Sequence, residues 1–429
     1  MITRLRAENF KSWKDTGDLR LGRLTGLFGT NSSGKTSILQ ILPLLKQTAE
    51  SPDRNRVLDT GNQDSPIYLG TFLDIIHGRQ KDAALDLSFG WAIPLNERLL
   101  ETSLIADEIS FQTSVIWGKE GPTVDSFEYG LGKFGQERVG MRRSLETEGK
   151  YKLTHQYDQV ESESLQVGAP IKCYGFPPDA LRKPGDITYL PDLQLAFEIL
   201  FRKVHYLGPI RPYPFRVYEW GGEKPADAGW DGEQAIPAIL ASKTKTQVAE
   251  WLKQMGLIHS FELQPVDQSR TIYQCRVKAT ATATEVLLPD VGFGVSQILP
   301  VLANCAMLGD GSTLLLEQPE IHLHPFAQAA LADVLIDAIN NRHIQIIVES
   351  HSEHILRRIQ RRISEEEFAA EDAALYFCHV ENGTSQADEL ELDSYGYIKN
   401  WPKNFFGDDM GEVAKMTIAA AERRKVGRK

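Results

Sequence analysis

Apolar and polar residues alternate near the start of the chain, and this pattern predicts two strands before residue 30. The first covers residues 2–9 (ITRLRAEN), and the second is the apolar run LTGLFG at 24–29. A helical period follows from about residue 34 to 48, where four aliphatic residues share one face: Ile38, Leu39, Leu42 and Leu45. The opening of the chain therefore predicts a strand–turn–helix unit.

Short apolar strands alternate with helices again in the second half of the chain. Two of these strands, TLLLE at 313–317 and HIQIIVES at 343–350, are each followed by a helical pattern. Strands that are apolar throughout are typical of parallel sheets covered on both faces. The predicted fold class is therefore α/β with a doubly wound sheet. Beyond it, an Asn382–Gly383 turn predicts a hairpin, and a last helix is expected at about 410–425.

The residues between these halves have a less regular pattern. The segments 83–93 and 108–117 are predicted as strands, whereas most of 95–185 is expected to be irregular, because it is polar and rich in glycine, proline and charge. It has no sustained heptads, so coiled-coil arms are not expected. The sequence thus predicts a long insertion between two α/β halves.

Composition narrows the class of protein. The chain has 429 residues, of which 42% are hydrophobic and 24% charged, and its net charge is −11. Any contact with DNA would need a local basic patch, such as RRIQRR at 357–362. The four cysteines lie far apart, and the longest apolar run, 298–308, is too short to cross a bilayer. We therefore expect a cytoplasmic protein without membrane segments.

Residues 29–36, GTNSSGKT, carry the phosphate-binding loop pattern G-x-x-x-x-G-K-[ST]. The pattern lies between a predicted strand and a predicted helix, which is the context that this loop requires. Glycine lets backbone N–H groups approach phosphate, and the helix points its positive end at the same group. Lysine adds a positive charge, and threonine offers a hydroxyl to Mg²⁺. The residues expected to bind ATP here are Gly29, Asn31, Ser32, Ser33, Gly34, Lys35, Thr36 and Ser37.

Three further segments place polar residues at the ends of predicted elements. LLLEQPE puts Glu317 at the end of an apolar strand, where a carboxylate can hold Mg²⁺. IIVESHSEH ends another strand at His351, and DVGFGVSQ opens a helix at Gly294, where an anion can bind. Thr36 and Glu317 are about 280 positions apart. A single Mg²⁺ site that contains both residues therefore requires distant parts of the chain to lie side by side.

In order, spacing and flanking residues, these four segments resemble the ABC-type ATPase heads of the SMC/RecF/OLD superfamily. The N-terminal segment LRAENFKSW is similar to the first strand of those heads. The segments EQPEIHLHP and ESHSEH most resemble the corresponding motifs of bacterial AAA-type ATPases of anti-phage systems, including the Septu type. The resemblance implies a P-loop ABC-type head split into two lobes by a mixed insertion. The expected parts are an N-terminal lobe at 1–94, an insertion of unknown role at 95–200, a C-terminal lobe at 201–364 and a small α+β extension at 365–429.

The resemblance also implies a role for each motif residue. Lys35 and Thr36 would act in the phosphate loop, Glu317 would be the Walker B carboxylate, and His351 the switch histidine. A signature segment would cap the γ-phosphate of ATP held by a second subunit, and two residues of the opening strand would reach the nucleotide. These are Gly292, Gly294, Ser296 and Gln297 for the signature, and Lys11 and Ser12 for the opening strand.

Two functional positions of such heads are not matched directly in this chain. The metal-contacting glutamine of most relatives has two candidates here, Gln63 and a residue within 68–78. The catalytic glutamate that normally follows the Walker B acid is Gln318 in this chain. Glutamine can orient water but cannot take its proton, and a positioned base typically contributes about 10²–10⁴-fold to the rate. We therefore expect slow turnover, or a base supplied by Glu320 or His351.

These inferences lead to one main functional hypothesis. The protein is expected to bind ATP and Mg²⁺, to form a homodimer or larger assembly around ATP, and to regulate a separate effector in bacterial anti-phage defence. The effector would be a protein such as an HNH nuclease or a toxin. The alternative is a RecF-like ATPase that acts directly on DNA in repair or recombination. A third hypothesis is an inert scaffold that binds nucleotide without hydrolysing it.

Overall fold

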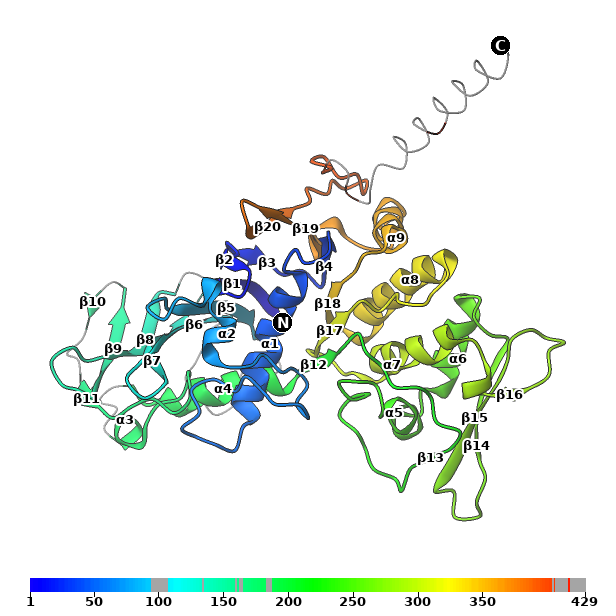
Figure 1. Ribbon diagram of the computed structural model, residues 1–429, viewed down its shortest axis with the longest axis horizontal. Coiled ribbons are helices and arrows are strands. Elements are labelled where there is room, and N and C mark those ends of the chain that lie inside the picture. The colour runs from blue at the N-terminus through cyan, green and yellow to red at the C-terminus, as the bar shows by residue number, and fades with distance from the viewer. Residues whose placement is uncertain are drawn as a thin grey trace, which may run out of the picture.

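The computed structural model describes residues 1–93, 107–132, 135–158, 160–161, 165–182, 187–402, 405 and 416. Within these residues the chain forms three sheets (Figure 1): a large antiparallel sheet, a central, mostly parallel sheet and a small sheet that includes β13 (Tyr218–Glu219). Helix α1 (Lys35–Glu50) packs between the two larger sheets, with apolar residues from both in one core. Helix α7 (Phe293–Met307) and its neighbours cover the other face of the central sheet.

The large sheet has the order β10-β9-β8-β7-β6-β5-β1-β2, with β11 beside β9 and β3 beside β1. Its inner face is aromatic: Phe89 and Phe111 pack on Phe197 of α4 (Leu190–Arg202), with ring centroids 5.9 and 5.0 Å apart. Its strands are β1 (Ile2–Phe10), β2 (Trp13–Asp15), β3 (Leu19–Arg20), β5 (Leu85–Ala92), β6 (Glu108–Trp117), β7 (Pro122–Leu131), β8 (Glu137–Arg143), β9 (Tyr151–Tyr157), β10 (Val160–Glu161) and β11 (Leu165–Val167).

This sheet corrects the expectation that residues 95–185 are mostly irregular. Strands β7, β8 and β9 pair one after another beside β6. Their inward residues are apolar, for example Val139 and Met141 on β8, whereas their outward residues are largely polar. One solvated face explains why the segment has a polar composition. These strands continue the sheet begun by β1 and β5, and the division of the chain at residues 94, 200 and 364 stays a prediction.

The central sheet joins distant parts of the chain in the order β12-β17-β18-β4-β19-β20. Neighbours from β12 to β19 are parallel, and β20 pairs antiparallel with β19. The strands are β12 (Val204–Leu207), β17 (Thr313–Glu317), β18 (Gln345–Glu349), β4 (Leu24–Gly29), β19 (Ala373–Glu381) and β20 (Thr384–Glu389). The predicted strands at 24–29 and 313–317 are confirmed with these bounds.

The predicted hairpin around Asn382–Gly383 is also confirmed, as β19 and β20. Because β19 pairs with β4, this hairpin completes the central sheet next to the phosphate loop. The helix predicted at about 410–425 lies outside the described residues, apart from Met416.

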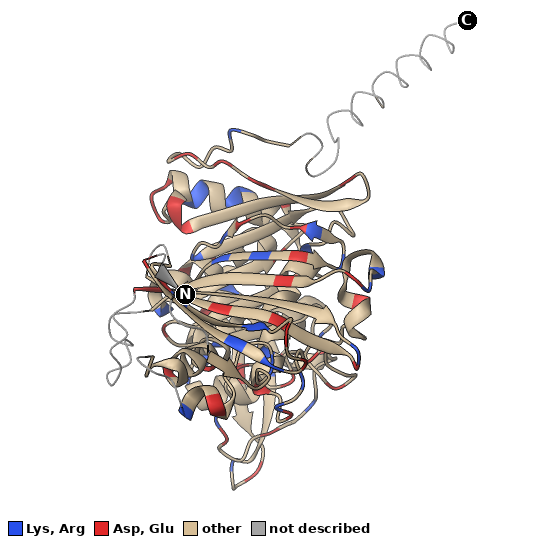
Figure 2. Cartoon of the chain, turned by 90° about the vertical axis from the view of Figure 1, so that its left-hand side faces the viewer, with Lys and Arg blue, Asp and Glu red and all other residues tan. Residues whose placement is uncertain are grey.

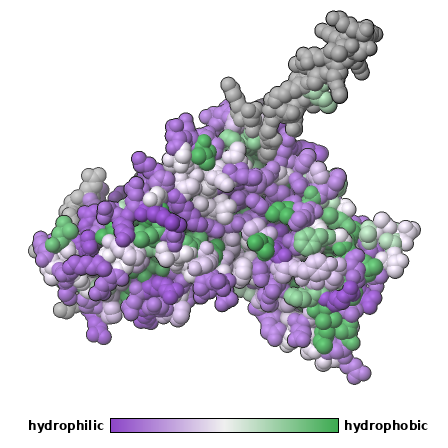
Figure 3. Space-filling view, in the orientation of Figure 1, coloured by the Kyte–Doolittle hydropathy of each residue, from purple (hydrophilic) through white to green (hydrophobic). Residues whose placement is uncertain are grey.

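The remaining elements are the strands of the small sheet, in the order β13-β15-β14 with β16 beside β15, and the other helices (Figure 1). None of the described helices is long and apolar enough to cross a membrane. The visible face in Figure 3 is mostly hydrophilic, with apolar residues in small patches. The elements are α2 (Phe72–Ile75), η1 (His77–Arg79), α3 (Pro178–Arg182), α4 (Leu190–Arg202), β13 (Tyr218–Glu219), α5 (Ala235–Ser242), α6 (Lys245–Gln254), β14 (Ser260–Pro265), β15 (Ile272–Lys278), β16 (Val286–Leu287), η2 (Leu288–Asp290), α8 (Pro325–Arg342), α9 (Glu353–Ser364) and η3 (Ala370–Asp372).

Gln345, the first residue of β18, ties the central sheet to the opening strand. Its side-chain amide donates to the carbonyl oxygens of Ile2 (2.7 Å) and Gly22 (2.9 Å). Its side-chain oxygen accepts from the Ile2 N–H (3.0 Å) and the Thr313 hydroxyl (3.1 Å). All four hydrogen-bonding positions of this buried amide are therefore used.

We expect Gln345→Met to lower the free energy of unfolding by about 2–5 kcal/mol, because buried N–H and C=O groups lose their partners. The matched control is Gln264→Met, at an exposed position of β14, where a change within about 0.5 kcal/mol is expected. Chemical denaturation of both variants measures the difference. Equal effects would contradict the role given to Gln345.

Candidate nucleotide-binding site

The segment between β4 and α1 turns at two glycines. Gly29 has a φ of 134° and Gly34 a φ of 88°, values that favour glycine. A Cβ atom on Gly29 would lie 1.9 Å from the Cys378 carbonyl oxygen, and one on Gly34 would lie 2.5 Å from Trp13 Nε1. Trp13 also donates a hydrogen bond of 3.0 Å from Nε1 to the Gly34 carbonyl. Strands β2 and β19 therefore hold the loop against the start of α1.

Lys35, in the first turn of α1, folds back over this loop. Its ammonium donates to the carbonyl oxygens of Thr30 (2.7 Å) and Gly29 (3.2 Å). Burial lowers the pKa of Lys35, and attraction to Glu349 offsets part of that effect. The first N–H groups of a helix have no partner within the helix. The start of α1 thus presents both N–H donors and a cation to the same space, which suits an anion.

A cavity of about 310 Å³ opens over the loop. It brings the predicted loop residues, except Gly29, together with Gln318 and His351, which follow two strands of the central sheet. Ser12 lines the cavity, whereas Lys11, also predicted to reach the nucleotide, does not. The Lys11 ammonium donates to the Gln40 side chain of α1 (2.5 Å), and its backbone N–H donates to the Ile75 carbonyl (2.7 Å), so the stretch 68–78 packs against Lys11. Neither Gln63 nor that stretch lines the cavity. The lining residues are Ser12, Asn31, Ser32, Ser33, Gly34, Lys35, Thr36, Ser37, Gln318, Glu349 and His351.

Two carboxylates end neighbouring parallel strands and are paired in register, Glu317 on β17 and Glu349 on β18. Glu317 accepts a hydrogen bond of 2.8 Å from the Tyr206 hydroxyl. Glu349 accepts from the Thr36 hydroxyl at 2.7 and 2.9 Å, and also from the Gln318 side chain. Burial raises the pKa of Glu317 to about 7 and also raises the pKa of Glu349. The two acids therefore lie side by side in a largely desolvated region next to the loop.

Glu320 and His351 form a second contact in this region. The His351 backbone N–H donates to Glu320 Oε1 at 2.6 Å. Glu320 is buried, which raises its pKa, and it does not line the cavity over the loop. His351 does line the cavity, and burial together with the charge of Lys35 lowers its pKa. Glu320 thus fixes the position of the His351 backbone through this hydrogen bond, from outside the cavity.

The predicted signature segment starts α7 but does not line this cavity. Gly292 caps the helix, and a Cβ atom on Gly294 would lie 2.8 Å from the His322 carbonyl oxygen. The Ser296 hydroxyl donates to the backbone of its own helix, and Gln297 is 3% exposed. Within one chain these residues stand apart from the loop. Their contact with ATP of a second subunit stays a prediction, and the burial of Gln297 turns its side chain away from such a contact.

Three residues near the site were not singled out from the sequence: Glu349, Tyr206 and Arg211. Glu349 had the same signal as Glu317, because it also ends an apolar strand. Arg211 is buried and donates to the carbonyl oxygens of Gln297 (3.0 Å) and Glu317 (3.3 Å), so it joins α7 to the end of β17. Burial lowers its pKa to about 10. Nothing in the local sequence around Tyr206 or Arg211 indicates these long-range contacts.

The donor set at the loop fits Mg²⁺. The Thr36 hydroxyl and the strand-end carboxylates are hard oxygen ligands, which Mg²⁺ prefers. No group of three or more His, Cys, Asp or Glu side chains within the described part of the chain is arranged to hold a metal. A site with few protein ligands is what Mg²⁺ uses when nucleotide phosphates supply the others.

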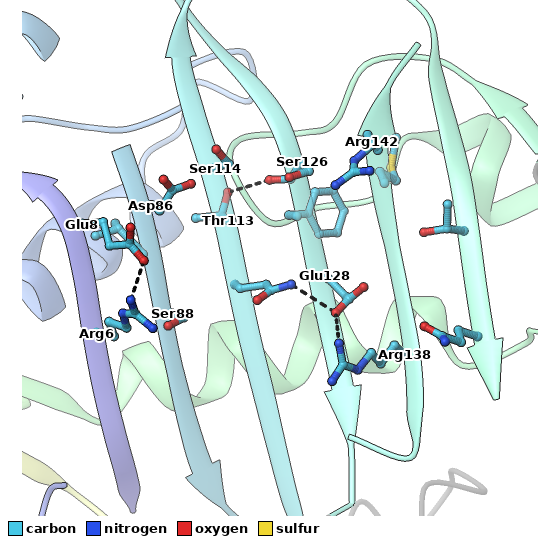
Figure 4. Close-up of a pocket in the computed structure, with 16 residues that line it drawn as sticks. Arg6, Glu8, Asp86, Ser88, Thr113, Ser114, Ser126, Glu128, Arg138 and Arg142 are labelled. Carbon is cyan, nitrogen blue, oxygen red and sulfur yellow. Dashed lines mark hydrogen bonds and ion pairs between the residues drawn. The ribbon is translucent and has the colours of Figure 1, made fainter. Parts of the chain in front are cut away.

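A second cavity, of about 460 Å³, lies on the outer face of the large sheet (Figure 4). Four of its charged residues form two pairs: Arg6 contacts Glu8 at 2.9 Å, and Arg138 contacts Glu128 at 3.5 Å. Figure 2 shows basic and acidic residues interspersed over this side of the molecule. The cavity therefore offers no concentration of one charge and is part of the solvated face of the sheet.

Three comparisons place the chain among known proteins. Residues 234–356 match the AAA ATPase domain family, and residues 369–416 match DUF3696, a protein family of unknown function. Over 387 residues the chain is 21% identical to the "ATP/GTP phosphatase" of Helicobacter pylori, which covers 86% of this chain and 90% of that protein. The AAA match includes the ends of β17 and β18. The family match and this relative support an ATPase of the AAA type.

Solved structures of SMC heads are also similar. The SMC head domain from Thermotoga maritima is 11% identical, with a TM-score of 0.41, over 91% of this chain and 99% of that chain. The SMC head domain from Pyrococcus furiosus, with an extended coiled coil and bound to the C-terminal domain of ScpA, is 10% identical, with a TM-score of 0.45. That comparison covers 91% of this chain and 96% of the other.

The raised pKa of Glu317 predicts how stability depends on pH in the nucleotide-free protein. Between the ordinary value of 4.5 and about 7, the folded state keeps a proton that the unfolded chain has lost. The free energy of unfolding should therefore fall as pH rises through this range. Burial of Glu320 and Glu349 acts in the same direction.

Glu317→Gln should remove part of this fall, up to about 3 kcal/mol at 1.4 kcal/mol per pKa unit. Denaturation at pH 5 and pH 7.5 without Mg²⁺ measures it. Glu233→Gln, at an exposed position, is the control and should keep the wild-type dependence. A Glu317→Gln variant with the full wild-type dependence would show that Glu317 is ionised throughout.

Proposed function

We propose that this protein is a P-loop ATPase that binds ATP with Mg²⁺ in the cavity over residues 29–36 and hydrolyses it slowly. The observation that carries the proposal is the convergence of Lys35, Gln318 and His351 on one cavity from separate parts of the chain. The AAA ATPase domain match at 234–356 and the similarity to an ATP/GTP phosphatase support the same activity.

Each residue of the cavity has a part in this proposal. The first N–H groups of α1 and the Lys35 ammonium bind the β- and γ-phosphates. Thr36 and a strand-end carboxylate hold Mg²⁺, which when bound neutralises charge on the phosphoryl group. The Gln318 amide orients the attacking water. His351 has a lowered pKa and is neutral near pH 7, so it can accept a proton, whereas Glu320 is bonded to the His351 backbone.

Gln318 is the reason for slow turnover in this proposal. We expect Gln318→Glu to raise the rate of phosphate release at saturating ATP by at least about 10-fold, because a carboxylate at this position can act as a base. A phosphate-release assay measures it, with Gln264→Glu on the exposed edge of β14 as the control for added charge. Fast hydrolysis by the wild-type protein without a gain in Gln318→Glu would contradict this account.

The proposal also includes assembly around ATP. The signature segment at the start of α7 lies apart from the loop of its own chain, which is the arrangement expected if it meets ATP on a second copy. Phe293, within this segment, is 40% exposed. A large exposed aromatic side chain beside a predicted contact surface is a common component of protein interfaces.

We expect ATP to shift the wild-type protein from monomer to dimer in size-exclusion chromatography with light scattering. Phe293→Asp should prevent this shift, because it places a charge in the interface. Val266→Asp, which replaces another exposed apolar residue (50% exposed), should behave like wild type. A wild-type protein that stays monomeric with ATP, or a Phe293→Asp variant that still dimerises, would contradict the proposed interface.

The biological role in the proposal is regulation of a separate effector, such as an HNH nuclease or a toxin, in bacterial anti-phage defence. Its support is the resemblance of EQPEIHLHP and ESHSEH to ATPases of such systems. Mass spectrometry of proteins that co-purify with the chain tests it, and recovery of no nuclease or toxin would count against it.

Direct action on DNA has less support. In the basic stretch at 357–362, Arg358 and Arg362 pair with Asp333, and Arg361 pairs with Glu365. Arg357 lies over the Trp401 ring, 4.4 Å from its centroid. These cations already have partners within the fold, whereas phosphate binding needs cations that face the solvent together.

A further inference from the structure

The hairpin of β19 and β20 packs against the phosphate loop at both of its glycines. This hairpin lies within residues 369–416, which match a protein family of unknown function. At the start of the loop, Cys378 of β19 pairs with Gly29. At the end of the loop, a Cβ atom on Gly34 would lie 2.6 Å from the hydroxyl oxygen of Ser385 on β20. The hairpin is therefore in direct contact with the segment that is proposed to bind ATP.

Ser385 is a buried residue whose hydroxyl is not used by the fold. The residue is 0% exposed, and its hydroxyl has no hydrogen-bond partner within the described part of the chain. Its backbone is fixed, because the Ser385 N–H donates to the Ser12 carbonyl at 3.0 Å. A buried hydroxyl without a partner destabilises the nucleotide-free protein. Since such groups are rare in folded proteins, this one points to a partner that becomes available when a ligand binds.

The hydroxyl of Ser12 is a second group of this kind, and it lies beside the first. Ser12 Oγ would be 2.7 Å from the same Cβ position on Gly34, and it also has no partner among the described residues. Unlike Ser385, Ser12 lines the cavity over the loop. A hydroxyl can donate one hydrogen bond and accept others at the same time. Ser385 can therefore donate to Ser12 while Ser12 donates to a ligand in the cavity.

The strand order indicates which end of the nucleotide these serines face. In the central sheet, β18 lies on one side of β4, and β19 and β20 lie on the other. Thr36 bonds to Glu349 of β18, whereas Ser12 bonds to Ser385 of β20. Mg²⁺ in P-loop ATPases bridges the β- and γ-phosphates. The two serines therefore lie toward the other end of the nucleotide, which carries the α-phosphate and the ribose.

We propose that Ser385 is a positioning residue of the nucleotide site: its hydroxyl donates to Ser12 and directs the Ser12 hydroxyl toward an oxygen of the α-phosphate or ribose. The inference rests on the proposed function and gives the β19–β20 hairpin a part in nucleotide binding. Hydrogen bonds that form a chain strengthen one another, and the nucleotide supplies the acceptor at the end of this chain. In the nucleotide-free protein the same hydroxyls contribute nothing to stability.

The test measures ATP affinity by calorimetry and the nucleotide-free stability by chemical denaturation. We expect Ser385→Ala to weaken ATP binding by about 3–10-fold, the effect of one hydrogen bond, and to leave the nucleotide-free stability unchanged or higher. The double variant with Ser12→Ala should bind ATP no more weakly than Ser12→Ala alone, because Ser385 acts through Ser12. The control is Gln386→Ala, at the next and exposed position of β20, which should match the wild type in both measurements.

The outcomes separate this inference from the proposed function. A wild-type protein that binds no ATP would overturn the proposed function itself. A wild type that binds ATP, with equal affinity in Ser385→Ala, would overturn only the role of Ser385. Losses that add in the double variant, or a Ser385→Ala variant that is destabilised without nucleotide, would also overturn that role. If Ser385→Ala does not fold, Ser385→Cys keeps a similar volume with a weak donor, and the same results are expected of it.

Discussion

β18 pairs in parallel with β4 on one side and with β17 on the other, and this double pairing decides where each polar residue of the site lies. In register, Glu349 stands beside Leu27 of β4 and beside Glu317 of β17. Because parallel strands end at the same edge of a sheet, the loop after β4 and the residues after β17 and β18 meet there. Gln345 fixes this arrangement at the opposite end of β18 through its contacts with Ile2, Gly22 and Thr313.

The chemistry of the site follows from burying acids at that edge. Glu317, Glu320 and Glu349 are 5%, 6% and 2% exposed, and burial raises the pKa of each. Such desolvated carboxylates are costly without cations. Lys35 and Arg211 supply fixed positive charge nearby, and a bound Mg²⁺ would add more. In this account, metal and nucleotide binding stabilise the fold because the bound cation offsets the cost of burying these acids.

Much of the site could be predicted from the sequence, because the loop pattern and the apolar strands are local signals. The strand ends at 29 and 317 agree with the prediction. Strands β7 to β9 were missed because a sheet with one solvated face has a polar composition that resembles a loop. Glu349 was passed over although it ends a strand as Glu317 does. Its place at the cavity depends on which strand lies next to β4, and only the tertiary structure decides that.

The contacts of Tyr206 and Arg211 could not be predicted for the same reason. Each residue acts on a strand more than one hundred positions away, and no local pattern marks such a partner. The most direct test of the account is a crystal structure of the protein with a non-hydrolysable ATP analogue and Mn²⁺, with the metal located by anomalous scattering. The account predicts the triphosphate on the loop at 29–36 and Mn²⁺ beside Thr36 at the ends of β17 and β18. A nucleotide bound elsewhere, or Mn²⁺ away from Thr36 and these strand ends, would contradict it.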